Sequence, residues 1–136
     1  MPQASAAQES NKALVQASFD RWGDGTGSPF ELLVSETEWT IVGSSPLSRT
    51  YKNRQDFLDT VIGPFNARMK TPLVPTVRGL YADGDMVIIL FDADDQPYHN
   101  PYTWYFRMRE GKAINVIAFF DTREFDEFWN RVSPMT

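Results

Sequence analysis

Hydrophobic and polar positions follow two different periods along this chain, and the change falls near Pro72. Before that residue, apolar side chains recur every three to four positions, which is typical of helices that bury one face. After it, apolar and polar side chains alternate, as in the strands of a sheet. The first helix is predicted from about Ser5 to Trp22, ended by Gly23, and the small polar residues 1–10 are expected to be frayed or loosely docked.

The first half of the chain also predicts two further helices and one short strand. Ser28 is a suitable N-cap and Pro29 a suitable first residue for a short second helix. A third helix is predicted over "KNRQDFLDTVIGPFNARM", with Asn53 as its cap and an interruption at Gly63-Pro64. Between these helices the alternating "TEWTIVG" predicts a strand at Glu38–Val42, which is followed by a loop over "SSPLSRTY".

The second half predicts two hairpins and a closing helix. The runs "LVPTVRGLY" and "DMVIILFD" flank "ADGD", and Asp-Gly between β-rich runs is a strong hairpin signal. "NPYTWYFRMR" and "KAINVIAFFD" flank "EG" in the same way, and "TREFDEFWNRV" has the spacing of a short amphipathic helix. Helices followed by an antiparallel meander predict a single α+β domain with a curved sheet over residues 1–136. Because helices can cover only one face of such a sheet, the other face is expected to meet solvent or a second copy.

The second hairpin indicates which side chains share a face of the sheet. If Glu110-Gly111 is a two-residue turn, Arg109 opposes Lys112, and counting outward places Asp121 opposite Asn100. The face containing this pair is aromatic with a polar end, which suits a ligand pocket, whereas the opposite face mixes aliphatic residues, a tyrosine and arginines and suits a dimer interface. A slip of one residue would change which partners share a face. The predicted pocket face comprises Asn100, Tyr102, Trp104, Phe106, Asn115, Ile117, Phe119 and Asp121.

Asp121 allows two interpretations. An acid followed by "TREF" is a suitable N-cap for the closing helix. On the aromatic face the same carboxylate would be poorly hydrated, which makes it a candidate general acid or base. Both roles are compatible with its position, so the open question is where the side chain points.

His99 and Asn100 lie at the entrance to the strand that faces Asp121. His99 is the only histidine, and it is either an exposed loop residue or, if it points inward, a proton shuttle. Asn100 either satisfies loop backbone groups or hydrogen-bonds the carboxylate of Asp121 or a substrate carbonyl. Tyr51 follows a loop, and it could reach the mouth of a cavity or stay exposed. The remaining candidates for a ligand-binding wall, which are aromatic and could equally be ordinary core residues, are Trp39, Tyr102, Trp104 and Phe119.

Composition narrows the classes of function. The net charge is −5 and no segment carries a basic stripe, which argues against a nucleic-acid partner. With no cysteine and one histidine, the chain cannot form disulfides, use a thiol or build a multi-histidine metal site by itself, and no metal or other cofactor is expected. "MPQASAAQES" lacks the features of a signal peptide, and no stretch approaches the roughly 20 apolar residues of a membrane span. A soluble, cytoplasmic protein without a membrane partner is therefore expected.

The order and spacing of three segments resemble the SnoaL-like branch of the nuclear transport factor 2 (NTF2) and ketosteroid isomerase superfamily. The segments are "WTIVGSSPLSRTYKNRQDFL", "YHNPYTWYFRMREGK" and "FFDTREF", and the similarity extends from about Lys12 to Val132. The resemblance implies a cystatin-like cone, in which a bent antiparallel sheet wraps around the N-terminal helices, with a cavity open at one end. It also implies homodimers through the outer sheet face. Asp121 matches the catalytic aspartate of polyketide cyclases and of limonene-epoxide hydrolase-like enzymes.

Three departures from the patterns of these enzymes limit the activity that the resemblance implies. The Arg-x-Asp of the epoxide hydrolases does not occur between Tyr81 and Asn100. Thr40 stands where the steroid isomerases place their base, and Trp104 stands near the position of their oxyanion-hole acid. Steroid isomerisation by that mechanism is not expected.

Two hypotheses follow for the cavity. In the first, a cyclase-like or epoxide-hydrolase-like enzyme acts on a small hydrophobic carbonyl or epoxide compound, with Asp121 as general acid or base and His99 or Asn100 assisting. In the second, the protein binds a small hydrophobic molecule without catalysis, and the polar groups only orient it.

Overall fold

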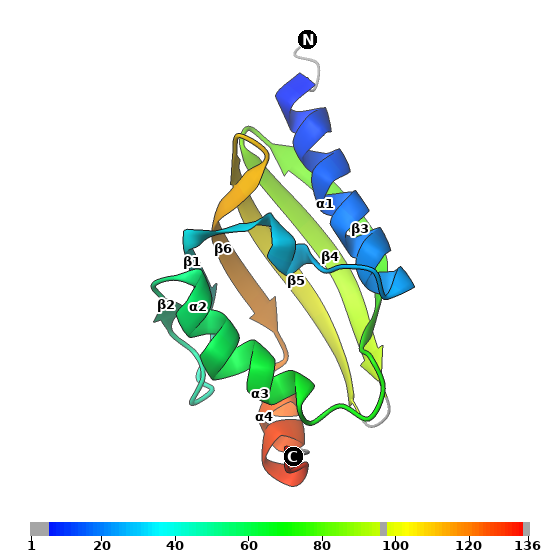
Figure 1. The fold of residues 1–136 in the computed structure, drawn as a ribbon, viewed down its shortest axis with the longest axis vertical. Helices are drawn as coiled ribbons and strands as arrows, with labels where there is room; N and C mark the ends of the chain where they lie inside the picture. Colours follow the sequence, from blue (N-terminus) through cyan, green and yellow to red (C-terminus); the bar gives the residue numbers. More distant parts are fainter. Residues whose placement is uncertain (1–5, 96–97, 135–136) are drawn as a thin grey trace.

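The computed structural model describes residues 6–95 and 98–134, and it shows a curved six-stranded sheet with helices packed on one face (Figure 1). The predicted α+β class is confirmed. Helix α1 crosses the sheet over β3 and β4, the α2–α3 segment crosses its other half, and α4 lies at the end where β6 stops (Figure 1). No helix of the described residues is long and apolar enough to cross a membrane. In chain order the elements are α1 (Ala6–Asp24), the 3-10 turn η1 (Pro29–Leu32), β1 (Leu33–Ile41), β2 (Thr50–Tyr51), α2 (Arg54–Phe57), the π-helical turn η2 (Leu58–Ile62), α3 (Gly63–Asn66), β3 (Val74–Asp83), β4 (Met86–Asp95), β5 (Tyr98–Arg109), β6 (Lys112–Phe120) and α4 (Thr122–Arg131).

The helix caps lie where the sequence predicts them. Ser28 caps η1, and its hydroxyl accepts the Phe30 N–H, although the segment forms one 3-10 turn instead of an α-helix. Asn53 caps α2 by accepting the Asp56 N–H at 2.8 Å. Helix α1 begins at Ala6, so residues 6–10 are helical, whereas residues 1–5 lie outside the described part of the chain.

The predicted interruption at Gly63-Pro64 is wrong, because α2, η2 and α3 run on as one helical segment to Asn66. Proline lacks an N–H, and its ring crowds the carbonyl four residues earlier in a regular α-helix. Here the Gly63 N–H donates to the carbonyl of Leu58, five residues back, so the turn before the proline is widened. The wider turn accommodates Pro64 without ending the helix.

The sheet is mixed, whereas the resemblance implied a purely antiparallel one. Its strand order is β2-β1-β6-β5-β4-β3, and β1 runs parallel to β6 while the other neighbours are antiparallel. Strand β1 starts at Leu33, earlier than the predicted Glu38, and the predicted loop after it contains β2. These two strands extend the sheet beyond the two predicted hairpins on the side of β6.

A bulge in β6 overturns the predicted facing of that strand. Arg109 opposes Lys112 across the turn as predicted, but the register shifts between Arg107 and Met108, so that Ile114 is the extra residue of β6. Beyond the shift Tyr102 opposes Phe120 instead of Phe119. Because side chains alternate between faces, one extra residue turns every later side chain of β6 to the other face. The inner face therefore receives Val116, Ala118 and Phe120, and the outer face receives Asn115, Ile117 and Phe119.

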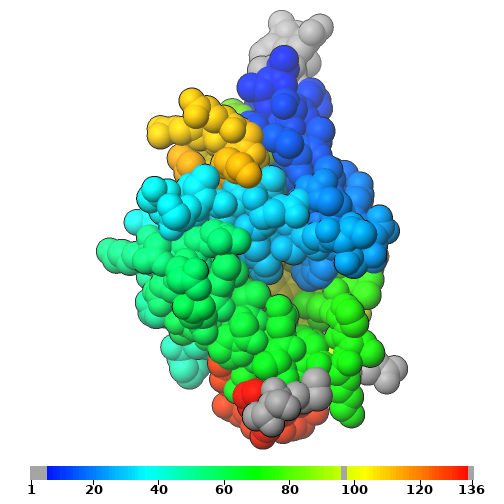
Figure 2. Space-filling model, viewed as in Figure 1, coloured from blue at the N-terminus to red at the C-terminus, as the bar shows by residue number. Residues whose placement is uncertain are grey.

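The core lies between the inner sheet face and the helices. Buried aromatic and aliphatic side chains from α1, β4 and β5 fill the part of the core next to α1. Side chains of α3, β5 and α4 fill the end of the core next to α4. Space remains between these two parts. In Figure 2 a hollow opens between the end of α1 with η1 and the connection from α3 to β3.

Candidate functional site

An apolar cavity of about 500 Å³ lies between the inner face of the sheet and the helices. This volume falls within the range of about 300–1,000 Å³ that is usual for small-molecule sites. The end of α1, η1, the α2–α3 segment and the connection to β3 form its mouth and sides, and β1, β5 and β6 form its floor. Its lining comprises Trp22, Ser28, Phe30, Trp39, Ile41, Phe57, Val61, Ile62, Phe65, Asn66, Met69, Lys70, Thr71, Pro72, Leu73, Tyr102, Trp104, Ala118, Phe120 and Phe125.

Aromatic rings that hold one another in place form most of the floor. Trp39 stacks on Phe57 with ring centroids 4.2 Å apart and meets Trp104 edge-on at 4.9 Å. Trp104 also packs within 6.1 Å of Phe30, and Tyr102 lies 5.2 Å from Phe120. Stacked and edge-on contacts of this kind stabilise the orientation of each ring in the wall. Three predicted wall residues, Trp39, Tyr102 and Trp104, therefore meet at the cavity.

The polar groups of the lining are few and carry no acid. They are the side chains of Ser28, Asn66, Lys70, Thr71 and Tyr102 and the indole nitrogens. No carboxylate and no histidine belongs to the lining among the residues that the structure describes. Lys70 and Thr71 are exposed, which places their charge and hydroxyl at the mouth. The interior of the cavity is therefore uncharged.

One buried indole nitrogen of the lining has no partner. Trp104 is 5% exposed, and its Nε1 makes no hydrogen bond with any described residue. A buried donor without an acceptor costs about 1–3 kcal/mol, so such groups are rare and need a reason.

Asn100 lies next to the cavity, and its amide is fully used inside the protein. The side chain is 0% exposed. Its Nδ2 donates to the backbone carbonyl of Asp121 at 2.9 Å and to the hydroxyl of Tyr98 at 2.6 Å, and its Oδ1 accepts the Asp121 N–H at 3.1 Å. The alternative that Asn100 satisfies backbone groups is thus the one seen, and the backbone belongs to Asp121 instead of the adjacent loop.

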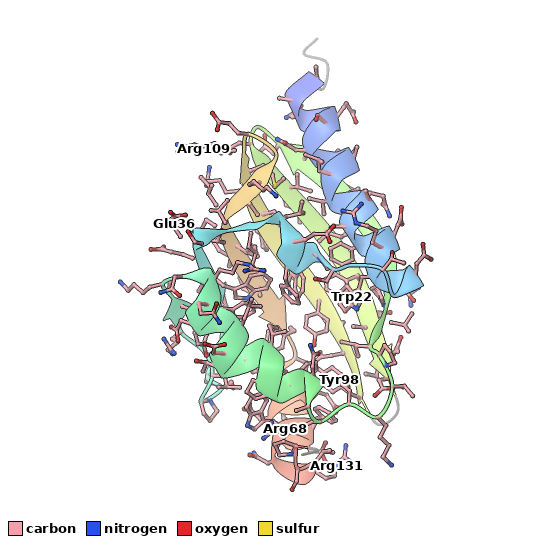
Figure 3. The ribbon with its side chains drawn as sticks, in the orientation of Figure 1. Trp22, Glu36, Arg68, Tyr98, Arg109 and Arg131 are labelled. Carbon is pink, nitrogen blue, oxygen red and sulfur yellow. The ribbon has the colours of Figure 1, made fainter. Side chains whose placement is uncertain are left out.

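Tyr98 links Asn100 to Tyr102 beneath α3. Its hydroxyl oxygen lies 2.6 Å from that of Tyr102, and its ring meets Phe65 of α3 edge-on. Figure 3 shows Tyr98 close to the end of α3. Burial raises the pKa of both hydroxyls well above the ordinary value for tyrosine. Both therefore stay protonated at neutral pH and act as neutral hydrogen-bonding groups.

The predicted placement of Asp121 on the aromatic face is wrong, because the β6 bulge shifts the register. Its carboxylate is exposed and caps α4: Oδ1 accepts the N–H groups of Arg123 at 3.0 Å and Glu124 at 3.2 Å. The side chain does not line the cavity. It borders a shallower concavity of about 370 Å³ on the outer side of the sheet, together with Arg78 and Asp92.

His99 also points away from the cavity. Its side chain is 63% exposed on the outer face of β5, where Nδ1 contacts the Asp94 carboxylate of β4. The hydrogen bond to Asp94 raises the pKa of the imidazole above 6.5. The predicted inward shuttle is therefore not what the structure shows.

Two other predicted wall residues lie elsewhere. Tyr51 is fully buried under α2 and donates its hydroxyl to the carbonyl of Leu47 at 2.7 Å, so it is neither exposed nor part of the cavity. Phe119 is 44% exposed on the outer face and meets Tyr105 there. The bulge moved Phe119 outward and brought Phe120 into the wall in its place.

Sequence reasoning also missed the helical side of the cavity. Phe57, Val61 and Ile62 lie in the third predicted helix, but nothing in their spacing distinguishes a helix face that is fully packed from one that borders a cavity. The signal for Phe120 was present. Asn115 lies opposite Arg107 in the structure, and a polar residue on the predicted pocket face was a sign that the register should shift by one.

No protein-family model matches this sequence. No curated protein matches it either. Solved structures do match its fold. A candidate SnoaL-like polyketide cyclase from Jannaschia sp. CCS1 superposes with a TM-score of 0.71 at 15% identity, covering 93% of this chain and 95% of that chain. A protein with a cystatin-like fold from Xanthomonas campestris gives 0.70 at 16% identity, covering 88% and 97%. An NTF2-like protein from Burkholderia thailandensis gives 0.66 at 17% identity, covering 87% and 95%.

The chain has the NTF2-like fold. The predicted resemblance is confirmed for the fold. It extends no further, because structural matches at 15–17% identity compare backbones and not the chemistry of a site. Within this NTF2-like fold, the cavity lies between the helices and the inner face of the sheet, and Asp121 caps the last helix outside it.

Proposed function

We propose that this NTF2-like protein binds a small, mainly hydrophobic molecule in the cavity between its helices and its sheet. One observation carries the proposal: about 500 Å³ of space is lined by interlocked aromatic and aliphatic side chains, with no acid or histidine among the described lining residues. Burial of apolar surface supplies the binding free energy, at about 25 cal/mol per Å². Acid–base catalysis needs a titratable group at the substrate, and the lining offers only the exposed Lys70 and the neutral Tyr102.

The enzyme hypothesis takes its support from the solved structure named as a candidate polyketide cyclase, and it requires Asp121 to reach a substrate. In the present arrangement the carboxylate is bound to two backbone N–H groups of α4. Asp121→Asn keeps the cap but removes the charge, so any turnover that depends on Asp121 would be lost while folding is retained. Full turnover of a substrate by Asp121→Asn would exclude that role.

Binding can be measured through the tryptophans, because three of the four, Trp22, Trp39 and Trp104, line the cavity. Titration with the uncharged aromatic probe 2-acetonaphthone is expected to quench their fluorescence with one-to-one stoichiometry. Ala118→Phe places a larger side chain on the floor and should abolish quenching. Ile117→Phe is the control, since it places the same phenylalanine side chain on the outer face of the same strand.

Thermal unfolding followed by circular dichroism establishes that both variants are folded at the assay temperature. If Ala118→Phe binds the probe as tightly as the wild type, the ligand does not occupy this cavity and the proposal fails. Equal loss of binding in both variants would also contradict it, because Ile117 lies outside the cavity.

A further inference from the structure

The mouth of the cavity differs in chemistry from its interior. Of the polar side chains in the described lining, the three exposed ones are Asn66, Lys70 and Thr71, which belong to the end of α3 and the connection to β3. This connection borders the hollow in Figure 2. The buried walls are aromatic and aliphatic, and no described residue brings a charge to them. The cavity therefore combines an apolar interior with a polar edge on one side.

Lys70 is the one charged residue of the described lining, and its ammonium forms no ion pair or hydrogen bond within residues 6–95 and 98–134. An exposed lysine is ordinary by itself, but the polar groups around this one are already engaged. Arg68, two residues earlier, donates to two backbone carbonyls and lies over the Trp129 ring. The carboxylate of Asp95 contacts the hydroxyl of Thr71 and not Lys70. Lys70 thus places one unpaired positive charge at the edge of an apolar cavity.

Asn66 adds a second unused donor to the same edge. It is the last residue of α3, and its side-chain amide makes no hydrogen bond with the part of the chain that the structure describes. The Met69 N–H donates to the Asn66 carbonyl at 3.1 Å, so Lys70 directly follows a turn that begins at Asn66. Both side chains therefore border the cavity from one short segment. An ammonium and an amide N–H₂ together suit an acceptor that carries negative charge.

We propose that the ligand is an amphipathic carboxylic acid, whose hydrocarbon body fills the cavity and whose carboxylate stays at the mouth beside Lys70 and Asn66. The inference rests on the proposed function and names the polar end of the molecule that the cavity binds. A carboxylate at the exposed mouth keeps its contact with water, so the cost of burying a charge is avoided. Its single charge matches the single cation, whereas a phosphate monoester carries more than one charge and favours arginine partners.

The test compares two probes of similar shape. 2-Naphthoate ends in a carboxylate, and 2-acetonaphthone carries a methyl ketone at the same position of the same ring system. Each is titrated calorimetrically into the wild type, Lys70→Glu and Asn66→Asp, and the effect of each substitution is compared between probes, which cancels their different hydration. Lys70→Glu replaces attraction by repulsion, so it is expected to weaken naphthoate about tenfold and the ketone less than about twofold. Asn66→Asp keeps the size of the side chain and should also weaken naphthoate more than the ketone.

Lys52→Glu is the matched control, because Lys52 is also exposed but lies outside the cavity lining. It changes the net charge by the same amount, so naphthoate should bind Lys52→Glu within about twofold of the wild type. The difference between wild type and Lys70→Glu should shrink as the ionic strength rises to about 1 M, where the Debye length is only about 3 Å. Equal weakening of naphthoate by Lys52→Glu and Lys70→Glu would overturn the inference, because net charge and not the mouth would then govern binding.

The remaining outcomes separate this inference from the proposed function. If both probes bind and Lys70→Glu affects them equally, the cavity binds hydrophobic molecules but does not select a carboxylate, and only the inference fails. The same conclusion holds if the wild type binds the ketone but not naphthoate. If neither probe binds the wild type, the proposed function fails and the inference fails with it. Thermal melts of all variants ensure that affinities are compared between folded proteins.

Discussion

Replacing Asn100 by alanine should destabilise the protein far more than its single amide suggests. Asn100 is fully buried and joins β5 to the start of α4 through both backbone groups of Asp121, and it also holds the Tyr98 hydroxyl. Alanine removes all three hydrogen bonds at once. It leaves the Asp121 N–H and the Tyr98 hydroxyl without their partner in Asn100, whereas the Asp121 carbonyl keeps the hydrogen bond from the Phe125 N–H of α4.

The magnitude follows from these contacts. Three hydrogen bonds at about 1 kcal/mol each give a loss of about 3 kcal/mol in the free energy of unfolding, and the Asp121 carbonyl is not orphaned because it still accepts the Phe125 N–H. For a chain of 136 residues this corresponds to a fall of roughly 10 °C in Tm. Loss of the Asn100 contacts also loosens the attachment of α4, so part of the effect should be local to this helix.

Urea unfolding monitored by far-UV circular dichroism and by tryptophan fluorescence measures the loss, with the slope m checked for constancy. Asn115→Ala is the matched control: the same substitution on the outer face of β6, at a half-buried side chain, should change stability by less than about 0.5 kcal/mol. A loss below about 1 kcal/mol in Asn100→Ala, or an equal loss in the two variants, would refute the role assigned to this network.

Three further predictions follow from the outer surface. Asp121→Ala should lose about 1 kcal/mol because two N–H groups of α4 lose their acceptor, whereas Asp121→Asn should lose only a few tenths, and chemical unfolding distinguishes the two. Asp94 raises the pKa of His99 above 6.5, so NMR titration should give a raised imidazole pKa that returns towards 6.5 in Asp94→Asn, and an unchanged pKa in that variant would contradict the contact. Any stabilisation of the fold by this pair is complete below pH 6.5 and is lost as the pH rises through the folded-state pKa. The exposed Phe119 lies on the outer sheet face, where we expect the interface of a homodimer. Sedimentation at tens of micromolar protein should find a dimer that Phe119→Glu converts to a monomer. A monomeric wild type would contradict the expectation.

The parts of the fold that depend on local signals could be predicted from the sequence. Ser28, Asn53 and Asp121 are short polar side chains in front of helical patterns, and each caps the helix or turn that follows. The Glu110-Gly111 turn was predicted from the two β-rich runs that flank it, and both of its residues have positive φ, 52° and 78°. Such features need only the neighbouring residues to be specified.

The parts that depend on distant strands could not be predicted in the same way. The extra residue at Ile114 lies where β6 is flanked by β5 on one side and β1 on the other, and the β1 pairing is irregular at the same level, between Leu33 and Glu38. The position of such a bulge depends on how all three strands pair, so the alternation of apolar and polar side chains within β6 alone does not predict it. The π turn before Pro64 is comparable, because its wider hydrogen bond is not coded by a residue type.

The one-residue shift changes the chemistry expected of the site more than it changes the fold. In the predicted register a carboxylate faced the aromatic wall, and the natural conclusion was acid–base catalysis. In the observed register the carboxylate of Asp121 serves its helix, while the backbone of the same residue orients Asn100. Asn100 in turn donates to Tyr98, whose hydroxyl oxygen lies 2.6 Å from that of Tyr102 on the cavity wall, so Asp121 supports the wall through its backbone and not by exchanging a proton. Because the described lining of the cavity holds no carboxylate and no histidine, this arrangement favours the binding of a hydrophobic molecule over the transfer of a proton.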